Sequence, residues 1–370
     1  MKVLFFLGHP AHFHLFKHVI HELSADGHEV HIVIKKKDIL EQLLRSSELP
    51  YVNLLPEGRS DGKLGIIIGV LKKNKALYSY CREHKPDIMA GTSAEIAHIG
   101  KLLGIPSVNF TEDDYHIVRN FGRVTYPFAD AILSPITCDN GRWNNKTVTY
   151  KGYHKLAYLH PNRFSPNEEI VKKYITVDKP YFILRFAKLN AHHDDGILGM
   201  DDELARNVVE KLSAHGNVYI TSERELAKDL EPYRLQINLL DIHHIMAFAT
   251  LFVGDSQSMS VEAAMLGTPS IRYSSFTGRI GVLEELQDKY ELTYGIHPAY
   301  PEQILSKIDE LISDEQIAQK FQDRRKKMLQ DKIDVSAFFA WFIGNFPDSY
   351  RIIREDPEYQ KTFQPEFMNL

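Results

Sequence analysis

The feature of this sequence that most limits its fold is a regular alternation of short apolar runs with longer amphipathic segments. Residues 3–7 form a continuous apolar run that ends at Gly8-His9-Pro10. A run of this kind, bounded by glycine and proline, is typical of a buried parallel strand. Apolar residues then recur at helical spacing as far as Gly27, and glycine commonly ends helices. The chain therefore begins as a strand followed by a helix.

The same alternation continues through both halves of the chain. In the first half the pattern predicts strands over residues 3–7, 30–34, 51–55, 87–90, 106–110 and 129–133. In the second half it predicts strands over residues 181–186, 218–221, 251–254 and 270–273, with helices alone beyond residue 301. Strands that alternate with helices imply right-handed crossovers, so each half is predicted to form a doubly wound parallel sheet of the α/β class.

The alternation loosens near residues 150–180, which are rich in proline and polar residues, and we place a domain junction there. We therefore predict an N-terminal Rossmann-like domain over residues 1–160 and a C-terminal one over residues 161–345. Residues 346–370 are predicted to form a tail that packs back on the N-terminal domain. Ligands of such sheets bind at the carboxyl ends of the strands, so we expect the two domains to face each other across a ligand-binding cleft.

Composition excludes several classes of function. The formal net charge of −5 argues against a nucleic-acid-binding protein, which normally has a basic surface. Two widely separated cysteines, Cys81 and Cys138, indicate free thiols in a reducing compartment. The apolar run at the N-terminus is too short for a signal peptide, and no run is long enough to cross a bilayer. We expect a cytoplasmic protein.

Residues 254–269 carry the strongest functional signal. They have the pattern of a strand, a tight turn and a helix, followed by Gly-Thr-Pro before the next strand. Ser256 is a good N-cap, and the N–H groups that follow it can bind an anion. Glu262 lies about 9 Å further along the helix axis, where its carboxylate could reach a ribose beyond a bound diphosphate. The alternative is an ordinary capped helix on which Glu262 is merely exposed.

This segment resembles the nucleotide-binding motif of GT-B glycosyltransferases and of non-hydrolysing UDP-N-acetylglucosamine 2-epimerases, which reads Ser-Gly-Gly, then Glu-Ala, then Gly-x-Pro. The resemblance implies that Ser256 and Ser258 contact phosphate and that Glu262 holds the ribose hydroxyls. Gln257 and Ser258 replace the two glycines of the pattern. Their side chains narrow the approach to the backbone, so hydroxyl and amide groups are expected to take part in binding phosphate.

Two further segments strengthen the resemblance. Residues 7–14, with 27–30, are similar to the first strand, turn and helix of the same superfamily, whose turn often carries an acceptor-side histidine. They are more similar still to a GT-B-like family of unknown function with a His-Pro-Ala-His start, as are residues 151–161. The resemblance covers most of the chain and implies the GT-B fold, two Rossmann-like domains facing across a cleft.

Histidines and carboxylates follow the predicted strands of the first half. A neutral imidazole can take a proton from a sugar hydroxyl near pH 7, and we predict His12, with His9 second, as the base. Glu112 and Asp113 follow another strand; the epimerases place a catalytic glutamate at the corresponding point, whereas the alternative is a polar turn.

Three more histidines, His14, His18 and His21, share one helix face at metal-ligand spacing, but a solvated helix face explains this spacing better. We predict no metal site and no cofactor.

Cations and one histidine complete the predicted donor site. Arg185 and Lys188 follow the first strand of the second half and could neutralise a diphosphate leaving group without a metal ion. His243 follows a loop that would lie near the nucleotide base in this fold. Residues 64–71 are apolar and are followed by lysines, which suits either a helix in the domain core or contact with an anionic membrane.

Together these features predict a metal-independent glycosyltransferase that uses a nucleotide-diphosphate sugar, in particular a UDP sugar, to make a cell-envelope or capsular polysaccharide. Its partners would be the nucleotide sugar and a glycan or lipid-linked acceptor, with peripheral contact to the inner membrane face. The first alternative is a UDP-sugar 2-epimerase of the same fold. The second is a non-catalytic nucleotide- or glycan-binding protein, which the loss of the motif glycines would favour.

Overall fold

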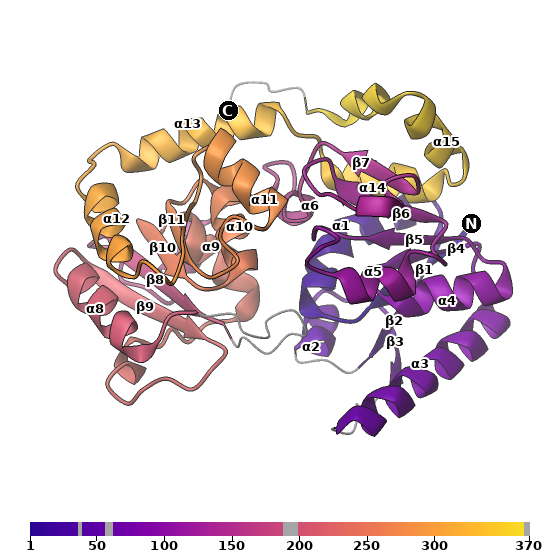
Figure 1. The fold of residues 1–370 in the computed structure, drawn as a ribbon, viewed down its shortest axis with the longest axis horizontal. Helices are drawn as coiled ribbons and strands as arrows, with labels where there is room; N and C mark the ends of the chain where they lie inside the picture. The colour runs from indigo at the N-terminus through magenta and orange to yellow at the C-terminus, as the bar shows by residue number, and fades with distance from the viewer. Residues whose placement is uncertain (36–38, 56–61, 188–198, 366–370) are drawn as a thin grey trace. The chain divides into compact units, whose positions relative to one another are not determined.

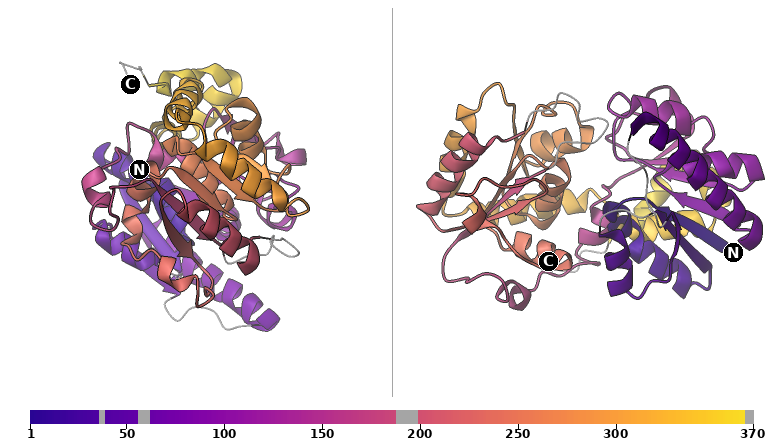
Figure 2. Two further views of the ribbon diagram at one scale, coloured as in Figure 1. Left: turned by 90° about the vertical axis from the view of Figure 1, so that its left-hand side faces the viewer. Right: turned by 90° about the horizontal axis from the view of Figure 1, so that it is seen from below.

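The computed structural model describes residues 1–35, 39–55, 62–187 and 199–365, with the backbone alone for residues 62–68 and 70. The chain forms two compact units. The first consists of Met1–Tyr158 and Lys332–Glu366, and the second contains Leu159–Asp331. Each unit is a parallel sheet with helices packed around it (Figures 1 and 2), so both units are Rossmann-like, as predicted.

The first unit contains a seven-stranded parallel sheet in the order β3-β2-β1-β4-β5-β6-β7. Its strands are β1 (Lys2–Leu7), β2 (Glu29–Lys35), β3 (Val52–Leu55), β4 (Ile88–Gly91), β5 (Ser107–Phe110), β6 (Ala131–Pro135) and β7 (Thr147–Tyr150). The first six strands confirm the predicted ones. β7 was not predicted because it lies in the polar segment in which the hydrophobic alternation fades.

Helices connect these strands and extend beyond them. They are α1 (Pro10–Ala25), α2 (Leu40–Ser46), α3 (Gly62–His84), α4 (Ala94–Leu103), α5 (Arg119–Thr125), η1 (Gly141–Trp143), α6 (Leu156–Leu159), α14 (Val335–Gly344), α15 (Asp348–Glu355) and η5 (Pro357–Phe363). Proline at the first position of α1 suits a helix start, and Gly27 follows the helix at φ 82°. Residues 64–71 were predicted either to pack in the domain core or to contact a membrane. Most of their side chains lie outside the described residues, so both possibilities stay predictions.

The boundary predicted at residue 345 is wrong, because α14 belongs to the first unit. α14 lies against α1 (Figure 1). The Phe339 ring is fully buried there, 4.7 Å from the Phe110 ring and 5.0 Å from the Tyr150 ring, measured between centroids. Just before α14, the Ile333 amide donates to the Lys151 carbonyl at 2.9 Å. The apolar side chains of α14 therefore complete the core of the first sheet, and the second unit ends at Asp331.

The second unit contains a five-stranded parallel sheet in the order β12-β11-β10-β8-β9. Its strands are β8 (Tyr181–Phe186), β9 (Asn217–Ser222), β10 (Leu251–Gly254), β11 (Ser270–Tyr273) and β12 (Tyr294–Ile296). Its helices are α7 (Glu168–Val171), α8 (Asp202–Ser213), η2 (Glu231–Tyr233), η3 (Leu239–Asp241), α9 (Ile242–Ala247), α10 (Gln257–Leu266), α11 (Gly281–Glu284), η4 (Glu285–Lys289), α12 (Glu302–Ile312) and α13 (Ile317–Gln330). β8 to β11 confirm the predicted strands, whereas the three-residue β12 with its central glycine is too short to leave a periodic signal.

Among the described residues, no helix is both long enough and apolar enough to span a membrane.

Candidate functional site

In the first unit, polar side chains from several loops gather at the carboxyl ends of the strands. His9 and His12 follow β1, Thr92 follows β4, and Glu112 follows β5. His154, with Lys155 beside it, follows β7. Because all these strands are parallel, their carboxyl ends lie along one edge of the sheet, which is where ligands of doubly wound sheets bind. The structure therefore brings His12 and Glu112 to the predicted edge and adds residues that the sequence analysis did not single out.

The His12 ring is fixed by two neighbours. Its Nδ1 atom accepts a hydrogen bond from the Gly8 backbone N–H at 3.1 Å. The Thr92 hydroxyl lies 2.7 Å from Nε2 and 3.1 Å from Nδ1, beside the ring edge between the two nitrogens. Since Nδ1 accepts from an amide, the proton of the neutral ring is assigned to Nε2, which donates to Thr92. In this state His12 is a hydrogen-bond donor rather than a base.

The surroundings of His12 also keep it uncharged. Burial lowers the pKa of His12 to about 3, and the nearby His9 and His154 rings and the Lys35 and Lys155 ammonium groups add to this effect. His9 is exposed and caps α1, because its Nδ1 atom accepts from the Ala11 N–H at 3.2 Å. The two rings lie 5.9 Å apart between centroids. Of the two predicted histidines, His9 is therefore the more exposed one.

Glu112 is held as a carboxylate by the segment that follows β7. Its Oε2 atom lies 2.7 Å from Lys155 Nζ, and its Oε1 atom accepts from the His154 backbone N–H at 2.5 Å. Burial alone would raise the pKa of Glu112, but the Lys155 ammonium and the contacts with His154 outweigh it, so the pKa lies below its usual value. A carboxylate stabilised in this way is a weak base.

The His154 ring belongs to the same cluster. It is 9% exposed, and its Nδ1 atom lies 4.0 Å from Glu112 Oε2. Burial lowers the pKa of His154 to about 4 against the opposing attraction of Glu112. Its Nε2 atom is buried and has no hydrogen-bond partner among the residues that the structure describes. His154 and Lys155 lie in the segment that resembles the His-Pro-Ala-His family, which was the signal that could have identified them.

Asp113, the remaining predicted carboxylate, is partly exposed. In the described ranges, no group of three or more His, Cys, Asp or Glu side chains is arranged to hold a metal ion.

In the second unit, the predicted strand, turn and helix are present as β10, residues 255–256 and α10. Ser256 is the N-cap, with its hydroxyl oxygen 3.4 Å from the Met259 N–H. In the part of the chain that the structure describes, the backbone N–H groups of Gln257 and Ser258 have no hydrogen-bond partner. Ser258 is exposed. The N-terminus of α10 therefore presents unbonded N–H groups and two hydroxyls, the arrangement that favours an anion.

Glu262 lies on α10 beside His243 of α9. His243 Nε2 is 3.4 Å from Glu262 Oε1, and the two side chains are 6% and 13% exposed. Both were predicted as nucleotide-sugar-binding residues, and the structure brings them together. The Glu262 carboxylate thus lies beyond the first turn of α10, next to an imidazole.

Arg185 is the last residue but one of β8 and forms an ion pair with Glu223, which follows β9. The Arg185 side chain is 17% exposed. Since its charge is already paired, Arg185 can bind a diphosphate only by sharing or exchanging this partner. Lys188 lies outside the described residues.

Two buried charged residues next to α10 were not predicted. Asp255 accepts the Ala187 N–H at 2.6 Å and the Met200 N–H at 3.3 Å, and burial raises its pKa. Arg272, on β11, is fully buried and donates to the Gln257 side chain. The sequence signals were an aspartate directly before the motif serine and a single arginine within an apolar strand.

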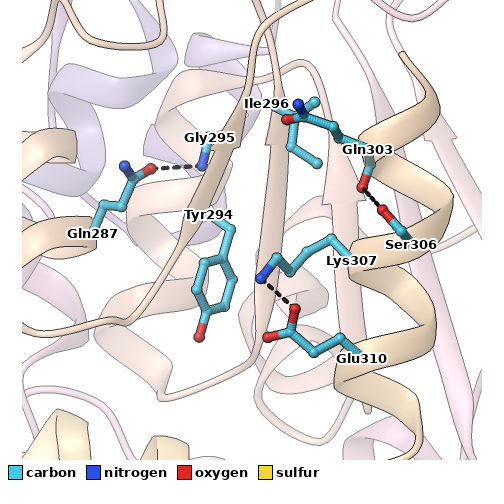
Figure 3. A pocket seen from close by; sticks show the side chains of 8 residues that line it. All are labelled: Gln287, Tyr294, Gly295, Ile296, Gln303, Ser306, Lys307 and Glu310. Atoms are coloured by element: carbon cyan, nitrogen blue, oxygen red, sulfur yellow. Dashed lines mark hydrogen bonds and ion pairs between the residues drawn. The ribbon is translucent and has the colours of Figure 1, made fainter. Parts of the chain in front are cut away.

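A pocket of about 360 Å³ lies elsewhere in the second unit, beside the edge strand β12 (Figure 3). Its polar groups bond mainly to one another. Gln287 accepts the Gly295 N–H at 2.7 Å, and Lys307 Nζ pairs with Glu310 at 2.6 Å and lies 4.6 Å from the centre of the Tyr294 ring. None of the predicted site residues lines this pocket.

Comparisons with known proteins agree with this architecture. The model of the family described as "Protein of unknown function (DUF354)" matches residues 1–331, and the chain belongs to this family. No curated protein matches the chain.

Solved structures show the same fold at low sequence identity. The UDP-GlcNAc 2-epimerase from Neisseria meningitidis is 14% identical, with a TM-score of 0.63 over 96% of this chain and 99% of that one. The UDP-GlcNAc 2-epimerase from Methanocaldococcus jannaschii is also 14% identical, with a TM-score of 0.64 over 85% and 94%. The spinosyn forosaminyltransferase SpnP is 13% identical, with a TM-score of 0.62 over 93% and 100%. The class defined by these likenesses is the GT-B fold.

Proposed function

We propose that the protein is a metal-independent glycosyltransferase that uses a UDP sugar as donor. The observation that carries the proposal is the combination on α10 of an open helix N-terminus, capped by Ser256, with the Glu262 carboxylate held by His243 further along the same helix. An anion site and a partly buried acceptor of hydroxyl hydrogen bonds at this separation suit a diphosphate and a ribose. No metal ion or other cofactor is part of the proposal.

The second unit would supply the donor site. The unbonded N–H groups of Gln257 and Ser258 and the hydroxyl of Ser258 would bind the diphosphate, with Arg185 and Lys188 as cations. Negative charge that develops on the leaving diphosphate would be stabilised by the dipole of α10 and by these cations.

The first unit would supply the groups that act on the acceptor. His12 donates from a fixed neutral ring, and Glu112 is stabilised as a carboxylate by Lys155. Neither geometry suits a base, so we assign proton removal from the acceptor hydroxyl to His9 or Asp113. The acceptor would be a glycan or a lipid-linked saccharide in cell-envelope or capsular polysaccharide synthesis, at the cytoplasmic face of the membrane.

Two related structures support a uridine nucleotide. The Neisseria meningitidis epimerase is described as bound to UDP-GlcNAc, and an S. aureus structure as a complex of MnaA with UDP. Both have the fold of this chain, with TM-scores of 0.63 and 0.62.

The pairing of Glu112 with His154 favours a second candidate, a UDP-sugar 2-epimerase. Epimerisation needs acid and base groups around the sugar, and here a carboxylate and an imidazole lie 4.0 Å apart. In this candidate Glu112 would become the base once a bound sugar nucleotide displaces Lys155 from it.

Nucleotide binding tests the proposal directly. We expect UDP at about 100 times its Kd to raise the melting temperature by several degrees, because ligand binding to the folded state alone adds about 2.7 kcal/mol of stability. UDP should stabilise more than GDP, CMP or TDP, and EDTA should leave the shift unchanged. Glu262→Gln should weaken UDP binding about tenfold, whereas Glu310→Gln, in the separate pocket at β12, should not.

Product analysis then separates the candidates. Release of UDP with transfer of the sugar identifies a transferase, and a new UDP sugar without UDP release identifies an epimerase. Binding without either product identifies a non-catalytic protein. If no nucleotide changes the melting temperature at millimolar concentration, the donor site is wrongly assigned.

A further inference from the structure

The Gln257 side chain replaces the first glycine of the superfamily motif, yet it is tied to the protein rather than free. Its Oε1 atom accepts from Arg272 Nη1 at 2.9 Å. Its Nε2 atom lies 3.4 Å from the Asp255 carbonyl, to which it can donate only weakly. The side chain is thus drawn toward β11, while the N–H groups of Gln257 and Ser258 remain without partners in the described chain.

Arg272 is held rigidly enough to fix this arrangement. Its side chain is 0% exposed, and Nη2 lies 3.3 Å from Glu284 Oε1. The same Glu284 oxygen accepts the Gly278 N–H at 3.0 Å. A Cβ atom added to Gly295 would lie 2.7 Å from Arg272 Nη2, so the guanidinium occupies the space that a side chain at position 295 would need. Arginine remains charged at neutral pH, so a fixed cation lies at the first turn of α10.

We infer that Arg272 is a positioning residue that makes the non-glycine motif of this chain able to bind a diphosphate. By holding the Gln257 side chain toward β11, it leaves the backbone N–H groups at the α10 N-terminus open to an anion. In the superfamily pattern, glycine achieves this by having no side chain. The inference rests on the proposed donor site, and it identifies what replaces the missing glycine.

Binding of sodium pyrophosphate and of UDP to the full-length protein, measured by isothermal titration calorimetry, tests this inference. Arg272→Met releases Gln257, and Gln257→Leu keeps a side chain of similar size that cannot bond to Arg272. Both variants should weaken pyrophosphate binding about tenfold, the effect of losing one charge-assisted contact. The double variant Arg272→Met/Gln257→Gly removes the released side chain and should regain most of the wild-type affinity.

Arg325→Met is the matched control. Arg325 Nε donates to the Met265 carbonyl at 2.6 Å, near the opposite end of α10. Its loss should lower the melting temperature but change pyrophosphate binding by less than about threefold. A general loss of stability would not be rescued by a second substitution at Gln257, so the rescue separates positioning from folding.

The outcomes distinguish the inference from the function proposed above. The inference is overturned if the double variant binds pyrophosphate no better than Arg272→Met, if Gln257→Leu binds like the wild type, or if the wild type does not bind pyrophosphate. If Arg272→Met does not fold, Gln257→Leu decides, because Gln257 is only partly buried. A different result separates the two ideas. If the variants change pyrophosphate binding as expected but UDP binds the wild type no more tightly than pyrophosphate does, the UDP-sugar donor is contradicted and the inference about Arg272 stands.

Discussion

Charge at the carboxyl end of the first sheet depends on three neighbouring side chains. Lys155 and the His154 amide stabilise Glu112 as a carboxylate, while burial keeps the His154 ring neutral. The lowered pKa of His154, about 4, does not follow from residue type alone, since an isolated histidine titrates near pH 6.5. The cluster therefore stabilises the folded chain only in a limited pH range.

We predict that the stability of the protein falls as the pH decreases from 7 to 5, and that His154 is one cause. The pKa of His154 is about 4 in the folded state and 6.5 in the unfolded chain, so between these values the unfolded chain binds more protons. His154→Gln should make the decline shallower by about 2 kcal/mol, in unfolding free energy measured by urea titration at each pH.

His12 acts in the same direction, because its pKa is also lowered, and it should preserve part of the decline in the variant. Glu112 contributes only at lower pH, since its pKa lies below the usual carboxylate value. His21→Gln is the control, because His21 is exposed on α1. An equal decline in wild type and His154→Gln would contradict the prediction.

At the residue scale, a motif and the ends of strands were enough to predict Ser256, Glu262, His243 and Glu112 as candidates from the sequence. It did not identify Arg272 or Lys155, because their importance depends on which side chains lie beside them after folding. It also suggested His12 as a base, and only the contact with the Gly8 amide shows which ring nitrogen carries the proton.

Among the elements, α14 differs most from expectation. Its residues are apolar almost all round, which indicates a buried helix, but periodicity does not say which sheet will bury it. β7 and β12 were missed for a related reason. Both are short edge strands of their sheets, and short strands are specified by their neighbours more than by their own pattern.

We predict that Phe339→Ala destabilises the first unit by about 3–5 kcal/mol, because the ring is fully buried against Phe110 and Tyr150 and its loss leaves a cavity. Hydrogen exchange should show faster opening of the amides of β5 and β7, with little change in β8 to β11. Phe128→Ala, at a ring that is 42% exposed, serves as the control. Equal effects on both sheets would argue against assigning α14 to the first unit.

For the whole molecule, the first unit is built from two segments of chain that are separated by the entire second unit. We therefore predict that residues 1–158 alone do not form a stable fold, whereas residues 159–331 alone do, because the second sheet has all of its strands within that range. Circular dichroism melting and limited proteolysis of the two fragments test this prediction.

A chain that joins Tyr158 to Lys332 through a short Gly-Ser linker, omitting the second unit, is the positive control and should fold cooperatively. Cooperative melting of residues 1–158 without the later segment would contradict the prediction.

The late position of α14 in the chain also affects folding during synthesis. During translation, residues 1–158 leave the ribosome's exit tunnel well before Phe339 is synthesised. Until then the apolar surface around Phe110, which Phe339 covers in the folded protein, stays exposed. The second unit is complete earlier and can fold first, which reverses the usual order in which N-terminal domains fold before later ones. During translation, therefore, the surface that most needs protection from aggregation belongs to the part of the protein that is made first.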